Sequence, residues 1–248
     1  MSQMTIFECV QMNFVYPHSQ ENILNNLNLK ITQGEAVSIL GANGCGKSTL
    51  LKIFAGLISP TTGEFKAFGQ TISEQLLNQD KFSLNYHRQI GFIFQDSEVQ
   101  LFCNSVYDEL AFGLLQLNLA TDIIKQRIRQ ISELFAIEHL LTKVPYRLSG
   151  GEKKKVALAA VLLLNPSVII LDEPSNALDP KTQRWLIDLL KQLHQLGKTI
   201  IISSHNLQLV ESITMRSLLF NEQHQIVADL TTEQLFKQTE LLKQVNLI

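Results

Sequence analysis

The stretch GANGCGKST, residues 41–49, decides the fold of this chain. It fits the pattern G-x-x-x-x-G-K-[ST]. The fixed positions of that pattern are occupied by Gly41, Gly46, Lys47 and Ser48. The apolar run AVSILG at 36–41 predicts a buried strand before it, and a helical pattern follows over 47–57. A strand that leads through a glycine-rich loop into a helix is typical of the start of a parallel α/β sheet.

This loop has the chemistry of a phosphate site. Its glycines let consecutive backbone N–H groups turn toward phosphate, and the helix start adds the positive end of its dipole. We expect Lys47 to reach the β- and γ-phosphates of a nucleotide and the Ser48 hydroxyl to ligate Mg²⁺. The rest of the loop is expected to contact the nucleotide too, namely Gly41, Ala42, Asn43, Gly44, Cys45, Gly46 and Thr49. The alternative is a chance glycine-rich turn, which the position between a predicted strand and a predicted helix disfavours.

Composition excludes several classes of protein. Of the 248 residues, 45% are hydrophobic and 18% are charged, which is ordinary for a globular domain and argues against disorder. A net charge of -2 gives no sign of a nucleic-acid partner. The three cysteines, Cys9, Cys45 and Cys103, form no CxxC and fit a reducing compartment better than a disulfide framework or a zinc site. The start shows no signal peptide, and the longest apolar run, 156–164, is far shorter than the roughly 18 residues of a membrane span.

The chain divides into an α/β core and an interrupting helical lobe. Residues 1–35 alternate apolar and polar positions, which predicts antiparallel strands. The middle, about 96–165, has helical periodicity. Further buried strands are expected in SVIILDEP (167–174) and KTIIISSH (198–205), with a helix over 181–196 between them. From about 215 the tail predicts two short strands and then one amphipathic helix, opened by Thr231 or Thr232.

Two carboxylates follow the predicted strand VIIL. Asp172 stands where a carboxylate can support the shell of Mg²⁺, and Glu173 can polarise the water that attacks the γ-phosphate. Ligands of open α/β sheets bind at this carboxyl end of the strands. The alternative is a simple turn before Pro174. The phosphate loop in the same sheet favours the functional interpretation.

Two more polar residues follow predicted strands. Gln95 ends IGFIF, and its amide oxygen could join a Mg²⁺ shell of hard oxygen ligands. His205 ends TIIISS and could donate a hydrogen bond to the γ-phosphate and to the attacking water. Taken alone, each could equally be an ordinary loop residue or a helix cap.

The stretch RLSGGEKKK, residues 147–155, looks like a second anion site. Ser149, Gly150 and Gly151 precede a basic helix start, where backbone N–H groups and the helix dipole favour an anion. A simple capped helix would also explain the glycines. It would not explain their position shortly before the two carboxylates.

Together these motifs resemble an ABC-type ATPase, the nucleotide-binding subunit of ABC transporters. GANGCGKST, Gln95, LSGGE, ILDEP, NALD and His205 follow one another in the order and approximate spacing of that family, over essentially the whole chain. The resemblance implies a P-loop NTPase core with an antiparallel β subdomain over 1–95 and 166–248, and an inserted helical signature subdomain over 96–165. Glu152 stands where many relatives have Gln, and Asn206 stands where Asp is common.

The resemblance also assigns roles to residues. It implies that Tyr16 stacks on the adenine of ATP, that Gln95 senses Mg²⁺, and that Asp179 is the D-loop aspartate. Glu173 would be the catalytic carboxylate and His205 the switch histidine, acting with Lys47. Two subunits of this family pack head to tail, so that Ser149, Gly150 and Gly151 of one subunit cap the ATP of the other. The second subunit could be identical or a paralogue.

One stretch indicates the subfamily. FQDSEVQLFCNSVYDELAFG, residues 94–113, resembles the FQxPxxQLF…TVxxDVAFG signature of energy-coupling-factor ATPases, with Ser97 in place of the usual proline. Such ATPases would lie at the cytoplasmic face of the membrane, bound to a transmembrane coupling protein and a separate substrate-binding membrane protein. They power uptake of cobalt, nickel or vitamins, and the short tail resembles the metal or biotin type. Another ABC transporter class and a soluble ABC ATPase are the alternatives.

The apolar residues of this stretch permit two interpretations. Those of VQLF (99–102) and of the helix over Val106–Phe112 could line a groove for the coupling helix of a membrane partner. They could equally form the core of the helical lobe, since amphipathic helices most often face their own domain.

Overall fold

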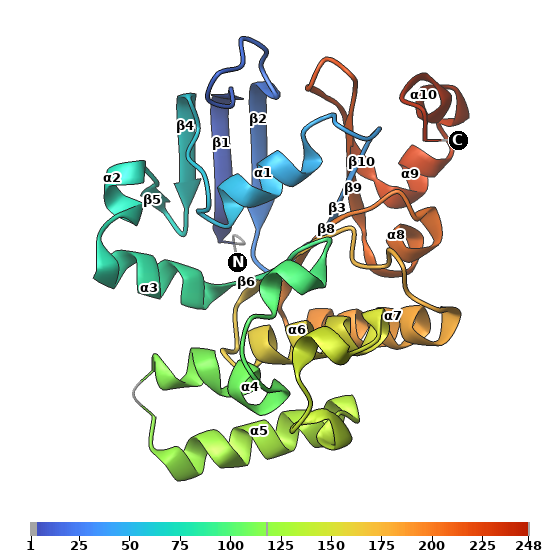
Figure 1. Cartoon of the computed structure of the whole chain (residues 1–248). Coiled ribbons are helices and arrows are strands. Elements are labelled where there is room, and N and C mark those ends of the chain that lie inside the picture. The colour runs from blue at the N-terminus through green and yellow to red at the C-terminus, as the bar shows by residue number, and fades with distance from the viewer. Residues whose placement is uncertain (1–3, 118, 248) are drawn as a thin grey trace.

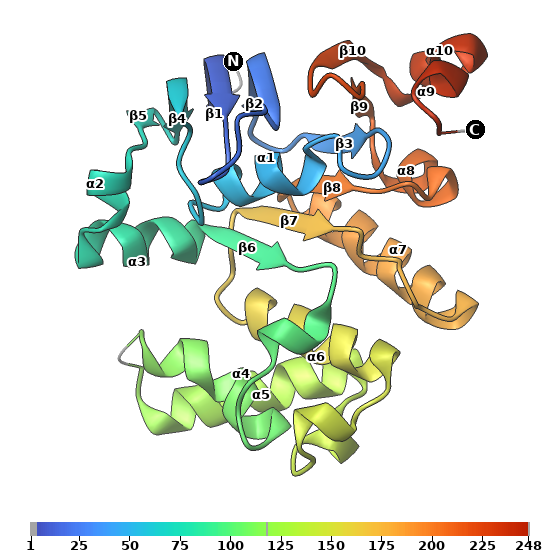
Figure 2. The ribbon, with the colours of Figure 1, turned by 45° about the horizontal axis from the view of Figure 1, so that its top comes forward.

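The computed structural model describes residues 4–117 and 119–247, and the strands among them form two sheets (Figure 1). Helix α1 (Lys47–Phe54) lies between these sheets, and a group of helices covers the opposite face of the second sheet (Figure 2). The phosphate loop therefore lies at the centre of the fold. Within the residues described, no helix combines the length and the apolar character that crossing a bilayer requires.

The first sheet, which we call the antiparallel sheet, has the strand order β2-β1-β4-β5. Its strands are β1 (Thr5–Phe14), β2 (Leu24–Thr32), β4 (Thr62–Ala67) and β5 (Gln70–Thr71). All neighbouring pairs are antiparallel, as the alternation in residues 1–35 predicts. In β2, Leu27 and Leu29 are buried while Asn28 and Lys30 are exposed, so one face of the sheet meets the core.

The second sheet, which we call the core sheet, has the strand order β10-β9-β3-β8-β7-β6. Its strands are β3 (Ala36–Leu40), β6 (Ile90–Ile93), β7 (Val168–Asp172), β8 (Thr199–Ser203), β9 (Arg216–Phe220) and β10 (Ile226–Thr231). The neighbouring pairs are parallel except for β9 and β10. Every residue of β3, β7 and β8 is buried, because helices cover one face and α1 with the antiparallel sheet covers the other.

Aromatic rings fix α1 against the antiparallel sheet. The ring of Phe54 stacks on Phe7 at a centroid distance of 4.7 Å and on Phe65 at 5.7 Å. The Tyr86 hydroxyl donates a hydrogen bond of 2.7 Å to the Phe54 carbonyl. The helix ends at Phe54, three residues before the predicted end, because Gly56 adopts a positive φ of 69°.

The helical lobe packs on the core sheet. It contains α4 (Val106–Leu115), α5 (Thr121–Phe135) and α6 (Gly150–Leu162), with short 3-10 helices η1 (Ser97–Gln100), η2 (Glu138–Leu140) and η3 (Pro145–Arg147). Val106, Phe135 and Val156 of the lobe share one hydrophobic cluster with Ile169 and Leu171 of β7. The lobe and the sheet therefore stabilise each other. Helix α7 (Pro180–Gln195) completes this layer, while α2 (Glu74–Leu77) and α3 (Asp80–Gln89) precede β6.

The tail differs from its prediction. After α8 (Leu207–Ile213), β9 and β10, it forms two short helices, α9 (Thr232–Phe236) and α10 (Thr239–Gln244). The expected single helix is wrong, because the backbone at Gln238, with φ -88° and ψ 58°, leaves the helical conformation. Thr231 is the N-cap and forms a capping box with Gln234. Leu235 and Leu242, one from each helix, are both buried in a small core beside β9.

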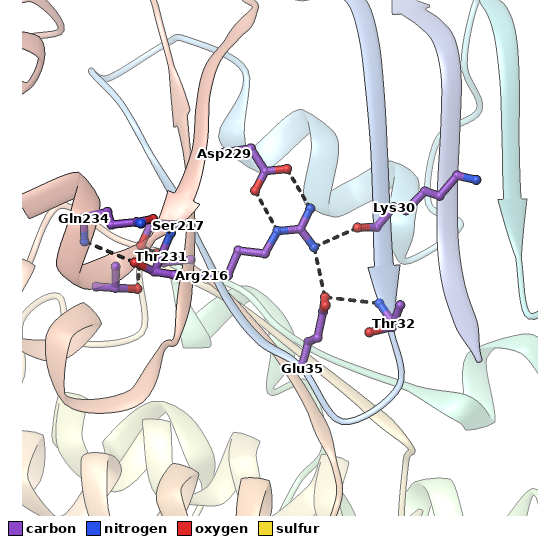
Figure 3. A network of polar contacts seen from close by, with 10 residues as sticks. Lys30, Thr32, Glu35, Arg216, Ser217, Asp229, Thr231 and Gln234 are labelled. Carbon is purple, nitrogen blue, oxygen red and sulfur yellow. Dashed lines mark hydrogen bonds and ion pairs between the residues drawn. The ribbon is translucent and has the colours of Figure 1, made fainter. Parts of the chain in front are cut away.

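Arg216, the first residue of β9, joins the two sheets (Figure 3). Its Nε and Nη2 atoms donate to the two carboxylate oxygens of Asp229, each at 2.7 Å. Its Nη1 atom donates to the Lys30 carbonyl at 2.9 Å and to Glu35 Oε2 at 3.1 Å. Glu35 Oε2 also accepts the Thr32 N–H, so one guanidinium connects β2 to β9 and β10.

Candidate nucleotide site

The phosphate loop is built where only glycine fits. Gly41 and Gly46 have φ values of 146° and 108°. A Cβ on Gly46 would lie 2.4 Å from the Ile23 carbonyl oxygen, and one on Gly41 would lie 2.7 Å from Cys45 Sγ and 2.8 Å from the Phe220 carbonyl oxygen. These glycines therefore allow the close backbone approach that turns N–H groups inward.

The Lys47 side chain is held over the phosphate loop by backbone carbonyl groups of that loop. Its Nζ atom donates to the carbonyl oxygens of Gly41 at 2.8 Å and Ala42 at 2.9 Å, and the residue is buried. The ammonium is thus already oriented at the start of α1, beside the N–H groups of the loop. A cation and a helix N-terminus at one point favour a phosphate group.

A pocket of about 460 Å³ lies against this loop. Its lining residues are Tyr16, Ile23, Asn43, Gly44, Gly46, Lys47, Ser48, Thr49, Gln95 and Glu173. Most of the predicted nucleotide contacts therefore converge. Gly41, Ala42 and Cys45 instead support the loop from outside the lining, and burial raises the pKa of the Cys45 thiol. Ile23 was missed, because an apolar residue in a loop carries no signal in the sequence.

Tyr16 stands at the mouth of the pocket. It is 37% exposed, and its hydroxyl lies 3.2 Å from Thr49 Oγ1. The Phe14 ring meets the Tyr16 ring edge-on at a centroid distance of 4.8 Å. A fixed and half-exposed aromatic face of this kind can stack on a planar base.

Glu173 has an unusual backbone and one unused oxygen. It follows β7 with a positive φ of 44°, a strained conformation for a residue other than glycine. Its N–H donates to the backbone and side-chain oxygens of Ser203, both at 3.1 Å. Its Oε2 atom lies 2.9 Å from His205 Nδ1, while Oε1 is buried without a hydrogen-bond partner among the described residues. Glu173 lines the nucleotide pocket, and a carboxylate there can accept a proton or orient a water molecule.

Asp172 and His205 lie beside the pocket and not in its lining. The Asp172 carboxylate is buried and accepts a hydrogen bond from the Ser203 hydroxyl. Ser203 therefore holds the Asp172 carboxylate by its hydroxyl proton and the Glu173 backbone N–H by its two oxygens. His205 was predicted to face phosphate, and its ring in this structure contacts Glu173.

Gln95 reaches the pocket from the loop after β6. The side chain of Gln100 shapes this loop, because its Nε2 atom donates to the Phe92 carbonyl at 3.1 Å and its Oε1 atom accepts the Phe94 N–H at 3.4 Å. The loop thus turns back on itself between 92 and 100. That turn presents Gln95 to the phosphate loop.

The donor atoms fit Mg²⁺. Ser48 offers a hydroxyl, Gln95 an amide oxygen and Asp172 a carboxylate, all hard oxygen ligands. The described residues contain no group of three or more His, Cys, Asp or Glu side chains that could hold a metal. Three oxygen donors suit an ion that keeps water and takes further oxygens from a bound phosphate, as Mg²⁺ does.

The signature residues form a second pocket, of about 340 Å³, which we call the signature pocket. Its lining residues are Ala136, Ile137, His139, Leu140, Ser149, Gly150, Gly151, Glu152, Lys155, Ala177, Asp179 and Thr182. Within the part of the chain that the structure describes, the two pockets share no lining residue. Ser149, Gly150, Gly151 and Asp179 are thus brought together, but apart from the nucleotide pocket. His139, Lys155 and Thr182 were missed.

Both helices that border the signature pocket are capped. Ser149 is the N-cap of α6, and its N–H and hydroxyl donate to Glu152 Oε2 at 2.8 and 2.7 Å. These two donors hold the pKa of the Glu152 carboxyl below its usual value. Asp179 caps α7, and its pKa is lowered chiefly by the Thr182 hydroxyl, which donates to Oδ2 at 2.6 Å. The capped-helix interpretation is therefore correct for α6, and the first residues of that helix line the signature pocket.

This chain is similar to known proteins in sequence and in fold. Residues 24–176 match the family model described as ABC transporter. The nickel import ATP-binding protein LarO of Lactiplantibacillus plantarum is 42% identical over 227 residues, which are 92% of this chain and 94% of that protein. The structure of cbiO1 from Clostridium perfringens, part of the ABC transporter complex cbiONQ, has a TM-score of 0.82 at 33% identity and covers 99% of this chain and 96% of that chain. The dimeric post-hydrolysis state of the ATP-binding cassette MJ0796, bound to ADP and Pi, has a TM-score of 0.83 at 27% identity over 92% of this chain and 99% of that chain.

Proposed function

Because this chain belongs to the ABC transporter family and has the fold of its ATPases, we propose that it is the ATP-hydrolysing subunit of a membrane importer of the energy-coupling-factor type. Two subunits, identical or paralogous, bind ATP between them at the cytoplasmic face of the membrane. The segment 96–165 acts as the signature subdomain, and the remainder of the chain binds the nucleotide. ATP hydrolysis in this pair drives transport by separate membrane proteins.

The observation that carries this proposal is the separation of the two pockets. One chain holds a nucleotide pocket and a signature pocket with no lining residue in common among the described residues. The N-terminus of α6, with its serine and two glycines, does not border the nucleotide pocket of its own chain. A head-to-tail pair supplies one, because the signature pocket of each subunit then faces the nucleotide pocket of the other. The dimeric cassette with ADP and Pi supports this arrangement.

In the proposed reaction the chain binds ATP, orients the attacking water molecule and accepts a proton from it. Tyr16 stacks on adenine, while Lys47 and the loop N–H groups hold the phosphates. Ser48, Gln95 and Asp172 would hold Mg²⁺, which would neutralise charge on the phosphate oxygens. Glu173 orients water for attack on the γ-phosphorus.

Attack breaks the bond to the bridging oxygen and leaves ADP and inorganic phosphate. Glu173, which lines the nucleotide pocket, takes up the proton of the attacking water on its carboxylate. The contact between His205 Nδ1 and Glu173 Oε2 fixes the carboxylate while this happens. Ser149, Gly150 and Asp179 of the other subunit exclude water from the opposite side.

The Glu173→Gln variant tests the catalytic role. We expect the ATPase rate to fall by at least about 100-fold, because an amide cannot accept the proton of water. The variant should form a stable dimer in ATP and Mg²⁺, visible by size-exclusion chromatography. Glu240→Gln, which changes an exposed carboxylate in α10, is the matched control and should change neither property. Unchanged turnover of Glu173→Gln would refute the assignment.

Mixing two inactive variants tests the shared site. Lys47→Ala removes the phosphate contact of the nucleotide pocket, and Gly150→Asp places a negative charge at the N-terminus of α6. Gly150 tolerates the side chain, because the nearest heavy atom to an added Cβ is the Ala177 carbonyl oxygen at 3.9 Å. Each variant alone should be inactive. An equimolar mixture should recover about a quarter of the wild-type rate, because half of the dimers are mixed and each has one intact site.

Two controls complete the mixing experiment. Gly150→Ala adds bulk without charge and should keep most of the activity. The rate per subunit of the wild type should fall on dilution, since a single subunit holds only half of each site. No recovery in the mixture, or a rate per subunit that is constant on dilution, would contradict the shared site.

An exposed apolar patch suits a membrane partner. Phe102 is 66% exposed and Phe112 is 47% exposed, and their rings meet edge-on at a centroid distance of 5.0 Å. Val99 is also exposed, whereas Val106 and Leu110 are buried in the lobe. The core interpretation is therefore correct for Val106 and Leu110, while the exposed side chains are accessible to a partner. We propose that Val99, Phe102 and Phe112 contact the coupling helix of the transmembrane protein.

The proposed cargo is a transition metal, nickel or cobalt. The similarity to nickel import ATP-binding proteins supports a metal over a vitamin. Cells that express the chain together with the proposed transmembrane coupling protein and substrate-binding membrane protein should take up labelled nickel or cobalt. The Glu173→Gln variant should abolish this uptake. Replacing both Phe102 and Phe112 with Ser should abolish uptake while the isolated subunit keeps its ATPase activity. Uptake of a vitamin instead, or no membrane partner at all, would refute the cargo.

A further inference from the structure

Helix α6 is attached to the loop of Gln95 by two consecutive lysines. The Lys153 ammonium contacts the Glu98 carboxylate. The Lys154 ammonium donates to the backbone carbonyl oxygens of Phe94 at 3.1 Å and of Gln95 at 3.2 Å. Lys154 is only 3% exposed although it carries a charge. The loop that presents Gln95 is therefore held by the helix that begins at the signature residues.

Burying the Lys154 ammonium costs free energy, because the charge loses its hydration. Burial lowers the pKa of Lys154 to about 8, while the nearby charges of Asp96 and Asp172 oppose that change. A methionine of similar shape would fill the same volume without desolvating a charge. Since the ammonium binds two successive carbonyls, its contribution is geometric, and it fixes the backbone at Gln95.

We propose that Lys154 is a positioning residue that locks Gln95 to the signature helix, so that the nucleotide pocket of a subunit and its own signature pocket move together. This inference rests on the proposed function, in which the signature pocket closes on the nucleotide of the other subunit. Lys154 then links the two ATP sites of the pair. ATP and Mg²⁺ at Gln95 in one site set the position of Ser149 at the other.

The distances along α6 make the link direct. Ser149 and Lys154 are five residues apart on one helix, so roughly 7.5 Å of rigid backbone separates them. Gln95 lines the nucleotide pocket, and Ser149 lines the signature pocket. The hydrogen bonds of Gln100 to Phe92 and Phe94 stiffen the loop at the other end. A shift of the Gln95 backbone is therefore passed to the start of α6 with little loss.

The Lys154→Met variant tests this link, with Lys154→Arg as the conservative rescue. Binding of a fluorescent ATP analogue without Mg²⁺ to the isolated Lys154→Met subunit should stay within about twofold of the wild type, because Tyr16, Lys47 and the loop N–H groups that hold the nucleotide are unchanged. ATP-driven dimerisation, measured in the Glu173→Gln background, should weaken by about tenfold or more, and kcat should fall by a similar factor. Lys154→Arg should restore both, since its guanidinium can donate to the same carbonyls.

A double variant separates positioning from simple stability. In the Gln95→Ala background, Lys154→Met should cause no further loss of kcat or of dimerisation, because the Gln95 side chain that Lys154 positions is already absent. Lys125→Met, on the exposed face of α5, is the matched control and should change nothing. If Lys154→Met does not fold, Lys154→Gln, which can donate to one carbonyl, replaces it with the same expectations.

Several outcomes would overturn the inference. They are unchanged dimerisation and kcat in Lys154→Met, full additivity with Gln95→Ala, and failure of Lys154→Arg to restore either property. Failure of the proposed function looks different, because the wild type itself would then neither hydrolyse ATP nor dimerise in ATP. A wild type that does both, together with a Lys154→Met variant that also does both, refutes the role of Lys154 alone.

Discussion

Replacing Arg216 with methionine should loosen the junction between the two sheets (Figure 3). Methionine keeps the apolar stem and removes the guanidinium that connects Asp229, Glu35 and the Lys30 carbonyl. The Arg216 and Asp229 side chains are 26% and 43% exposed, so solvent screens their pair, which contributes about 1 kcal/mol. The hydrogen bond to Glu35 and the one to the Lys30 carbonyl together add about 2 kcal/mol.

The expected loss of unfolding free energy for Arg216→Met is therefore about 3 kcal/mol. For a chain of this size each kcal/mol lowers the midpoint of thermal unfolding by about 3 °C, so the midpoint should fall by about 9 °C. Differential scanning calorimetry measures this shift. Arg129→Met is the control, because Arg129 is 81% exposed and pairs with Glu133 only along the surface of α5. Equal shifts in the two variants would refute the reasoning.

Three further predictions concern the core, the site and the thiols. Phe54→Ala should cost about 3–5 kcal/mol in urea unfolding, because the ring is fully buried between Phe7 and Phe65, whereas exposed Leu84→Ala should cost under about 0.5 kcal/mol. Ser203→Ala should weaken Mg²⁺ binding in the presence of ATP by about tenfold, because the serine hydroxyl orients Asp172; an unchanged titration curve would contradict that role. Burial raises the pKa of Cys103 from 9.0 to about 11, so its thiolate at pH 8 is about 100-fold scarcer than in the unfolded chain. Alkylation of native Cys103 by iodoacetamide should accordingly be slow at pH 8 and should become faster up to about pH 11. A rate for the native protein at pH 8 within tenfold of the rate in guanidinium chloride would disprove this prediction.

The sequence predicts the fold class because its signals are local. The phosphate loop between a strand and a helix, with the apolar strands before Asp172 and His205, predicts a parallel α/β core. The alternation in 1–35 predicts the antiparallel strands, and the helical periodicity over 96–165 predicts the inserted lobe. The similarity to solved ABC cassettes confirms this fold. Residues 58–89 carried no prediction, yet they form β4, β5, α2 and α3. Strand β4 pairs with β1, about fifty to sixty residues earlier. The periodicity of a sequence does not indicate which distant segment a strand pairs with.

The site divides in the same way. Gln95 and Glu173 could be predicted, because each follows a strand of a parallel sheet whose carboxyl ends meet at one edge. Ser203 and Lys154 could not, since a serine at the end of an apolar strand and a lysine in a basic helix start are both commonplace. Their importance comes from the groups that face them, the Asp172 carboxylate and the Gln95 carbonyl. The break at Gln238 was missed because packing against the small core beside β9 decides it.

The separation of the two pockets has a consequence for descent. In a pair of identical copies every substitution enters the assembly twice, so a harmful change in either pocket damages both ATP sites together. Gene duplication removes this constraint, since one copy can then lose its carboxylate while the other loses its signature serine, and both defects fall on a single site. The other ATP site stays intact, so two point mutations convert a symmetric pair into an asymmetric one with a single active site.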